Sequence, residues 1–409
     1  MLLKNIEGKK LFSIDILNKF LLILIALYCF FSGAQVYNAS YSIITGLVII
    51  AIILSCLGNI KYVLYKMPKE VYWALGIFLT CILTASIAIG DIRSVKKSLI
   101  FGYWMLPLFF IYLLNNRKLH KISINVGLHS ALFVTSSSAI IEFLKIHRRV
   151  DGIYGNPNHL ASMLDLLLPF CIMSLAYVYS KTKNKLLVAV LSVNVIAGLY
   201  ALHISGSRGG LLGVVLGLVS TTIIYIVKNY KLKNNRVLYI CVATISMLSI
   251  CSLGVSLANI KRVDDYERVA LVKSSYNMWK DHKIVGVGVA NWAYEYQNKY
   301  ILPEAKAPKL DTPHNVFAYF FSTSGIIGGV GYCVCMIILT LVLIRNLNIG
   351  NWYCIAMLWA LFAINLHGCV DVGLTLKSAA RLFYMCLGIA LAEIVNTRNI
   401  SRGKDNDKL

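Results

Sequence analysis

The chain has 409 residues, of which 58% are hydrophobic and only 14% are charged, and its mean hydropathy is +0.69. A soluble domain cannot bury that much apolar surface, so the composition excludes a soluble globular protein and indicates a polytopic membrane protein. The net charge of +22 does not indicate a nucleic-acid-binding protein, because the basic residues are scattered in short runs between apolar segments.

Long apolar segments bounded by charged residues recur along the whole chain. A helix needs about 20 apolar residues to cross the hydrocarbon core, so we predict an all-α polytopic membrane protein with about twelve transmembrane helices. The predicted spans are approximately 17–35, 40–59, 71–90, 98–115, 122–144, 158–179, 186–204, 210–227, 237–258, 315–344, 351–370 and 379–396. The first is expected to be a retained helix, since no small-residue cleavage site follows it. The tenth contains Gly325, Gly328, Gly329 and Gly331, which can bend or interrupt a helix.

Lys and Arg indicate the orientation of these spans. They are more frequent in the connections on the side of the N-terminus, which places both termini in the cytoplasm. We therefore predict nine helices within 1–258, an outside loop at 259–313, three helices within 314–396 and a cytoplasmic tail at 397–409. The long polar loop then faces the periplasm if the protein comes from a Gram-negative bacterium.

The first polar motif on the predicted outside is RRVDGIYGNPNHLA, residues 148–161. Arg149, Asn156 and Asn158 stand beside turn residues and are candidate contacts for a sugar or a phosphate. The alternative is a turn that caps the sixth helix.

The second polar motif is SGSRGG, residues 205–210, between the seventh and eighth spans. Glycines around Arg208 allow a backbone or a ligand to approach closely, while the guanidinium group faces an anion. The alternative is an interfacial arginine that extends to lipid headgroups.

The long loop begins with a predicted amphipathic helix at 264–280, lying on the membrane surface or on the helix bundle. Its apolar residues recur at three- and four-residue steps: Tyr266, Val269, Val272, Tyr276 and Trp279. Arg268 is a second candidate for anion binding, although a surface ion pair with Asp264 or Asp265 is the more common role of such an arginine.

The loop ends at His314 and Asn315, where apolar sequence resumes. A histidine at the start of a helix at the membrane surface can act as a base or contact an anion. Asp371, at the outside end of the eleventh span, is a further candidate. Five other histidines are possible rivals: His147, His159, His203, His282 and His367. We find no Ser-His-Asp or Cys-His set, no zinc-ligand spacing and no phosphate-binding loop of an ATPase, so no metal or cofactor is expected.

Taken together, the many-helix layout and three motifs resemble the O-antigen ligase and polymerase superfamily, most closely the O-antigen ligases. The motifs are SGSRGG, DDYERVAL with the following MWKDHKIVGVGVANW, and PHNVFAYFFSTSGIIGG. The resemblance implies a catalytic role for Arg208, Arg268 and His314 and, less strictly, substrate contacts by Arg149 and Asn156. Asn158, Asn315 and Asp371 are further candidate substrate contacts from their positions at the predicted outside.

The resemblance also implies a metal-independent, inverting glycosyltransferase of the GT-C type in the inner membrane. Such an enzyme moves O-antigen from undecaprenyl diphosphate to lipid A-core oligosaccharide at the periplasmic face. Fixed guanidinium groups can stabilise a departing diphosphate, which agrees with the residues themselves. An O-antigen polymerase is the nearest alternative. A transporter is another, but the acidic residues within spans, Glu142, Asp165 and Glu393, also suit structural roles.

Overall fold

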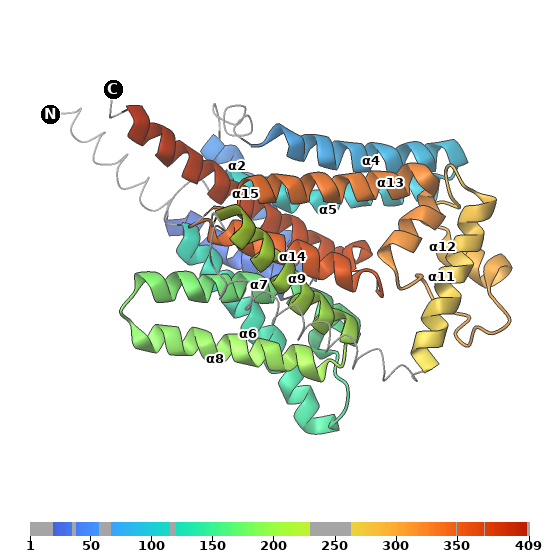
Figure 1. Ribbon diagram of the computed structural model, residues 1–409, viewed down its shortest axis with the longest axis horizontal. Helices are drawn as coiled ribbons and strands as arrows, with labels where there is room; N and C mark the ends of the chain where they lie inside the picture. Colours follow the sequence, from blue (N-terminus) through green and yellow to red (C-terminus); the bar gives the residue numbers. More distant parts are fainter. Residues whose placement is uncertain are drawn as a thin grey trace.

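The computed structural model describes residues 19–34, 38–56, 67–114, 120–229, 263–348, 350–371 and 373–406, and all regular elements in these ranges are helices (Figure 1). Each predicted span within these ranges coincides with a helix. The predicted ninth span, 237–258, lies outside the described residues.

The helices are Lys19–Gly33, α2 (Asn38–Cys56), α4 (Lys69–Ile89), α5 (Ile92–Leu114), α6 (His120–Ile146), α7 (Pro157–Lys181), α8 (Lys185–Ile204), α9 (Arg208–Asn229), α11 (Val263–Asp281), α12 (Trp292–Glu295), α13 (Val316–Arg345), α14 (Trp352–His367) and α15 (Lys377–Asn406). Short turns of helix are η1 (Gly152–Tyr154), η2 (Tyr296–Tyr300) and η3 (Gly373–Thr375). Within the described residues, 8 helices are long and apolar enough to cross a membrane, and Lys19–Gly33, Ser40–Ile52 and Trp352–His367 are shorter apolar helices. The chain is therefore a multi-pass membrane protein, while the count of twelve spans stays a prediction.

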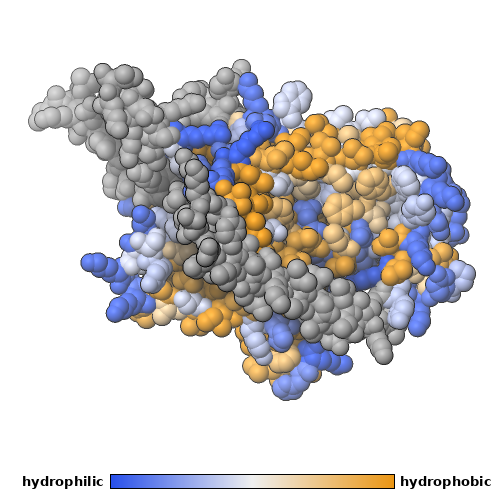
Figure 2. All heavy atoms as spheres, in the orientation of Figure 1, coloured by the Kyte–Doolittle hydropathy of each residue, from blue (hydrophilic) through white to orange (hydrophobic). Residues whose placement is uncertain are grey.

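The long helices run side by side, and α11 and α12 lie across one end of them (Figure 1). We call this end, which carries residues 263–314, the loop end. In Figure 2 hydrophobic residues cover the sides of α4 and α13, and hydrophilic residues gather over α11 and α12. This distribution is expected if the sides face lipid and the loop end faces water.

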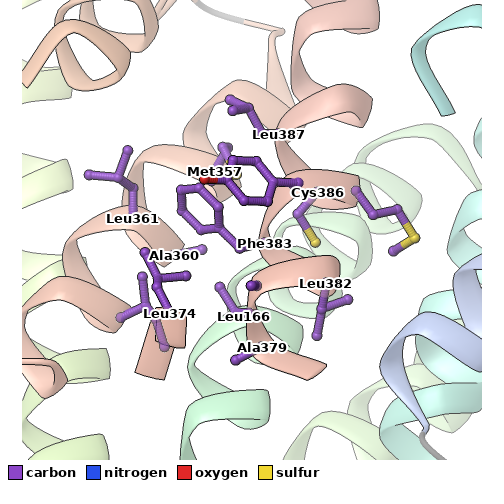
Figure 3. Close-up of a cluster of buried hydrophobic side chains, with 14 of the residues drawn as sticks. Leu166, Met357, Ala360, Leu361, Leu374, Ala379, Leu382, Phe383, Cys386 and Leu387 are labelled. Atoms are coloured by element: carbon purple, nitrogen blue, oxygen red, sulfur yellow. The ribbon is translucent and has the colours of Figure 1, made fainter. Parts of the chain in front are cut away.

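The centre of the bundle is formed by α7, α14 and α15. Figure 3 shows Leu166 of α7 packed with Met357 of α14 and with Phe383 and Cys386 of α15, all of them fully buried. Lipid tails are as apolar as these side chains, so close packing rather than exclusion of water holds such helices together.

Helices α9 and α14 also pack closely. A Cβ atom on Gly213 would lie 2.6 Å from the carbonyl oxygen of Ala363, and one on Gly217 would lie 3.0 Å from that of Trp359. The Trp359 indole donates to the carbonyl of Val214 at 2.7 Å. Glycines at these positions therefore let two backbones meet where any side chain would separate them.

The tenth predicted span is interrupted, as its glycines indicated. Gly325 has φ 61° and ψ −161°, so α13 consists of a first part before this residue and a second part after it. The second part lies along α4, whereas the first part turns toward α11 and α12 (Figure 1). A break within a helix leaves backbone groups without their usual partners, so they must bond elsewhere.

The loop segment 283–288 supplies those partners. Val287 and Gly288 donate their N–H groups to the carbonyls of Ser322 and Thr323 at 2.9 and 2.8 Å. In return, the N–H groups of Ile326 and Ile327 bond the carbonyls of Lys283 and Ile284 at 2.8 and 3.4 Å. The loop and the interrupted helix thus form one hydrogen-bonded unit.

The turn between α4 and α5 fixes the same loop from the other side. Asp91 accepts hydrogen bonds from the side chains of Ser94 and Asn291, each at 2.9 Å, and from the Arg93 N–H at 3.1 Å. Desolvation alone would raise the pKa of Asp91, but these hydrogen bonds outweigh it and lower the pKa to about 2. The loop is therefore anchored by a carboxylate that stays ionised.

Helix α11 packs on the bundle through a different face from the one that its apolar stripe suggested. Its buried residues are Ala270, Leu271, Ser274, Ser275 and Met278, while Tyr266, Val269, Val272 and Tyr276 are exposed. The buried face contains small side chains, so α11 can approach closely, and Ser275 accepts a hydrogen bond from the Trp292 indole at 3.0 Å. The expectation that the stripe packs on the bundle is wrong for these four exposed residues. Contact of the stripe with a membrane surface stays a prediction.

Candidate functional site at the loop end

The start of α13 is tied to the chain that follows α14. The Asn315 side chain caps α13 by accepting from the Ala318 N–H at 2.8 Å, and it donates to the carbonyl of Cys369 at 2.7 Å. Val316 donates its N–H to the carbonyl of Gly368 at 2.8 Å. Asn315 thus has a structural role at this junction, and whether it also contacts substrate stays a prediction.

His314 precedes this cap with φ 49°, a conformation that is uncommon outside glycine. Its Nδ1 atom lies 3.4 Å from Oδ1 of Asp371, whose side chain is buried, while the His314 side chain is 24% exposed. A carboxylate on Nδ1 favours the tautomer with the proton on that nitrogen. The other ring nitrogen, Nε2, then carries a free electron pair that can accept a proton.

A second acid–histidine pair lies beneath the first. His367 Nδ1 is 2.6 Å from Asp165 Oδ2, and both side chains are buried. His367 Nε2 is 3.4 Å from the Ser207 hydroxyl, which also accepts the Gly210 N–H at 3.3 Å. These contacts join α7 and α14 to the first turn of α9. Because Arg208 is the first residue of α9, the pair fixes the backbone from which its guanidinium group extends.

The glycines of SGSRGG serve helix packing. A Cβ atom on Gly209 would lie 2.7 Å from Cδ2 of the His367 ring, and one on Gly210 would lie 2.7 Å from Cβ of Ala161. We expected them to allow close approach of a backbone or a ligand. The structure fills the space beside both glycines with side chains, including His367 of α14 and Ala161 of α7.

The turn at 205–210 is held from the other side by Arg149. Its Nε donates to the carbonyl of Ser205 at 2.7 Å, and its Nη2 donates to Oδ1 of Asn158 at 2.6 Å. The Asn156 side chain caps α7 by accepting the N–H groups of Asn158 and His159. The capping alternative for this motif is therefore what the structure shows, and contacts of these residues with a sugar or phosphate stay predictions.

Arg208 and Arg268 are both half-buried at the loop end. The charge of Arg268 acts on the His367 ring, and those of His314, Asp371 and His367 act on His159, so these groups lie within range of one another's charges. Residues far apart in the sequence thus meet in one cluster of polar side chains. No group of three His, Cys, Asp or Glu residues within the described ranges could hold a metal ion.

Sequence reasoning did not pair Asp165 with His367. Both were considered singly, His367 as a rival histidine and Asp165 as a polar residue of a packing face. Their positions differ by 202 residues, so no local spacing could reveal the contact. The one available signal was that a carboxylate and an imidazole both lie inside or at the end of apolar spans, where unpaired polar groups are costly.

An apolar groove runs beside the cluster, between α11 and the first part of α13. Its lining includes Val272, Tyr276 and Trp279 of α11 with Ala318 and Phe321 of α13. On a helix, Val272 and Tyr276 follow Arg268 by one and two turns on the same face. A molecule with a charged head at Arg268 could therefore lay an apolar part along this groove.

The fold and the cluster define a multi-pass, all-helical membrane protein with a basic, histidine-containing site at one end of its helices. Residues 193–333 match the family model described as O-antigen ligase. The match extends from α8 through the loop to the second part of α13, and it confirms the resemblance to the O-antigen ligase superfamily. A comparison with curated proteins finds no match.

Proposed function

We propose that the protein is an O-antigen ligase that transfers O-antigen from undecaprenyl diphosphate to lipid A-core oligosaccharide at the periplasmic face of the inner membrane. The observation that carries the proposal is the contact of His314 with Asp371, together with the contact of His367 with Ser207 before α9, in a chain whose residues 193–333 match the ligase family model.

The reaction needs a group that accepts the proton of the attacking hydroxyl. In the proposed mechanism Nε2 of His314 is that base, and Asp371 holds the ring so that Nδ1 keeps its proton. The acceptor hydroxyl of the core sugar attacks the anomeric carbon from the side opposite the diphosphate, which inverts the configuration. A separation of 3.4 Å between His314 and Asp371 is long, and such contacts often shorten when substrate binds.

The reaction also needs stabilisation of the leaving diphosphate. Arg208 and Arg268 are the proposed partners, because planar guanidinium groups bind phosphate oxygens in pairs of hydrogen bonds. The support from the molecule is that Arg208 extends from a first helical turn that is fixed by Ser207 and His367. The apolar groove beside Arg268 suits the lipid part of the donor.

Lipopolysaccharide from a deletion strain tests the function. A ligase deletion should leave a complete core without any O-antigen. A core that carries one repeat unit would instead show an O-antigen polymerase, the alternative within the superfamily, and unchanged lipopolysaccharide would contradict both.

Variants in the same strain test the site. Arg208→Lys and Arg268→Lys keep the charge but lose the planar fork, so ligation should fall sharply while the protein still inserts in the membrane. Arg345→Lys, at the other end of the bundle, is the matched control and should ligate normally. Full ligation by both site variants would remove these arginines from the site.

A further inference from the structure

Arg381 is a buried arginine that neither the cluster nor the proposed reaction uses. It lies in the second turn of α15 and is only 8% exposed. Its guanidinium carbon lies 4.5 Å from the ring centre of Tyr41 on α2 and 5.2 Å from that of Tyr103 on α5. A charged group thus sits between two aromatic rings inside an apolar part of the bundle.

Two other basic side chains at helix ends have acidic partners. Lys121 pairs with Glu393 at 2.9 Å, and Arg345 pairs with Glu70 at 3.4 Å. Arg381 has neither an acidic partner nor a hydrogen-bond acceptor within the described part of the chain. None of its guanidinium nitrogens is both fully buried and without a hydrogen-bond partner. Its N–H donors, which number five, therefore reach the protein surface to a small extent.

The two tyrosine rings offset part of the cost of burying this charge through cation–π attraction. An arginine within a membrane helix is still costly without a counter-ion, so the charge favours an anion. Lys377 stands one helical turn before Arg381 on the same helix and adds a second positive charge at this position. An anion between Arg381 and Lys377 would be attracted by both positive charges.

The surroundings show from which direction an anion would come. The Tyr103 side chain is 47% exposed and forms the outer wall of the site. One helical turn away on α5 are Leu99, Ile100 and Leu106, which are exposed and apolar. Such a surface faces acyl chains in a membrane, so the Tyr103 side of the site faces lipid.

We propose that Arg381, Tyr41 and Tyr103 form a binding site for the phosphate group of a membrane lipid, whose acyl chains lie along α2 and α5. The phosphate oxygens accept the N–H groups of Arg381, and Lys377 adds electrostatic attraction. An ordinary anionic phospholipid and a phosphorylated glycolipid share this chemistry. The site is independent of the proposed ligase function, because none of its residues belongs to the cluster around His314.

Native mass spectrometry of the purified full-length protein in detergent tests the site. The probes are phosphatidylglycerol, diphosphorylated lipid A, uncharged diacylglycerol and inorganic phosphate. The wild type should retain the two phosphorylated lipids and not diacylglycerol. Arg381→Gln should lower their retention about tenfold, as expected for the loss of charge-assisted hydrogen bonds. Arg345→Gln, which removes one charge elsewhere, should retain them like the wild type.

Three further variants keep the test valid if Arg381→Gln does not fold. Arg381→Lys keeps the charge but loses the planar guanidinium group and its paired N–H donors, so it should bind both phosphorylated lipids less well than the wild type. Tyr103→Ala removes the outer wall and should do the same, whereas Tyr103→Phe keeps the ring and should not. Equal lipid retention by the wild type and the Arg381 variants would overturn the proposal. Retention of diacylglycerol as strong as that of the two phosphorylated lipids would also overturn it. Competition by inorganic phosphate alone would indicate a free-anion site and would also overturn it. Preference for lipid A over phosphatidylglycerol would identify the glycolipid as the source of the phosphate.

Discussion

Replacing Gly325 by alanine should release the loop from the interrupted helix. A Cβ atom at this position would lie 2.1 Å from the carbonyl oxygen of Ile284, which is backbone and cannot rotate away. The backbone angles of Gly325, φ 61° and ψ −161°, also belong to a region that other residues occupy at a cost of about 1–3 kcal/mol. The variant can therefore keep the native arrangement only with strain in both the loop and the helix.

The alternative for the variant is to undock segment 283–288. That would break the four backbone hydrogen bonds to Ser322, Thr323, Ile326 and Ile327. At about 0.5–1.5 kcal/mol each, their loss costs about 2–6 kcal/mol. Either route destabilises docking by a few kcal/mol, so amide exchange of Val287 and Gly288 should become at least about tenfold faster.

Hydrogen exchange of the purified protein, followed by mass spectrometry of peptides that cover 284–291, measures this effect. Gly76→Ala on α4 is the control, because a Cβ atom there meets nothing within 4 Å and alanine favours a helix. Ligation in cells should fall with Gly325→Ala and not with Gly76→Ala, since α11 and the start of α13 both depend on the docked loop. Unchanged exchange together with normal ligation in the Gly325 variant would refute this reasoning.

Four further changes test other parts of the molecule. His314→Ala should lower ligation about 10²–10⁴-fold. In the pH profile of the purified wild-type enzyme, loss of activity on the acid side supports His314 as a base, and loss on the alkaline side supports His314 as a cation. Asp371→Asn should also reduce turnover, because an amide no longer fixes the His314 tautomer, and normal rates would exclude that role. Because the pKa of Asp91 is lowered to about 2, its contribution to loop docking should be complete above about pH 4 and lost as the pH falls toward 2; a change between pH 5 and 8 in the protection factor of the Asn291 amide, which is its exchange corrected for the intrinsic pH dependence, would contradict this. A cysteine at Lys306 should react with a membrane-impermeant thiol reagent in cells with a permeabilised outer membrane. The background should carry Cys369→Ser, since Cys369 is an exposed native thiol, and labelling only after lysis would overturn the proposed orientation.

The sequence predicted the features that depend on local composition. The apolar spans could be placed from their length, and the interruption of α13 from its glycines, because both follow from the physics of a helix in lipid. The site residues could be located at one end because charge and turn residues mark that end. The contacts between distant segments could not be predicted: the bonding of Ser322 to Val287, the Asp165–His367 pair and the buried position of Arg381 depend on which helices become neighbours. The buried face of α11 was misjudged because small residues that pack closely do not stand out in a hydrophobic pattern.

The contact between α9 and α14 bears on how the protein can move. At Gly213 and Gly217 the two backbones touch without intervening side chains, so neither helix can slide or rotate against the other without a collision. Arg208 at the start of α9 and His367 at the end of α14 must therefore travel as one rigid body. Any opening at the loop end therefore has to come from a hinge elsewhere. The contact between α9 and α14 thus serves as a fixed reference for the side chains at both ends of it.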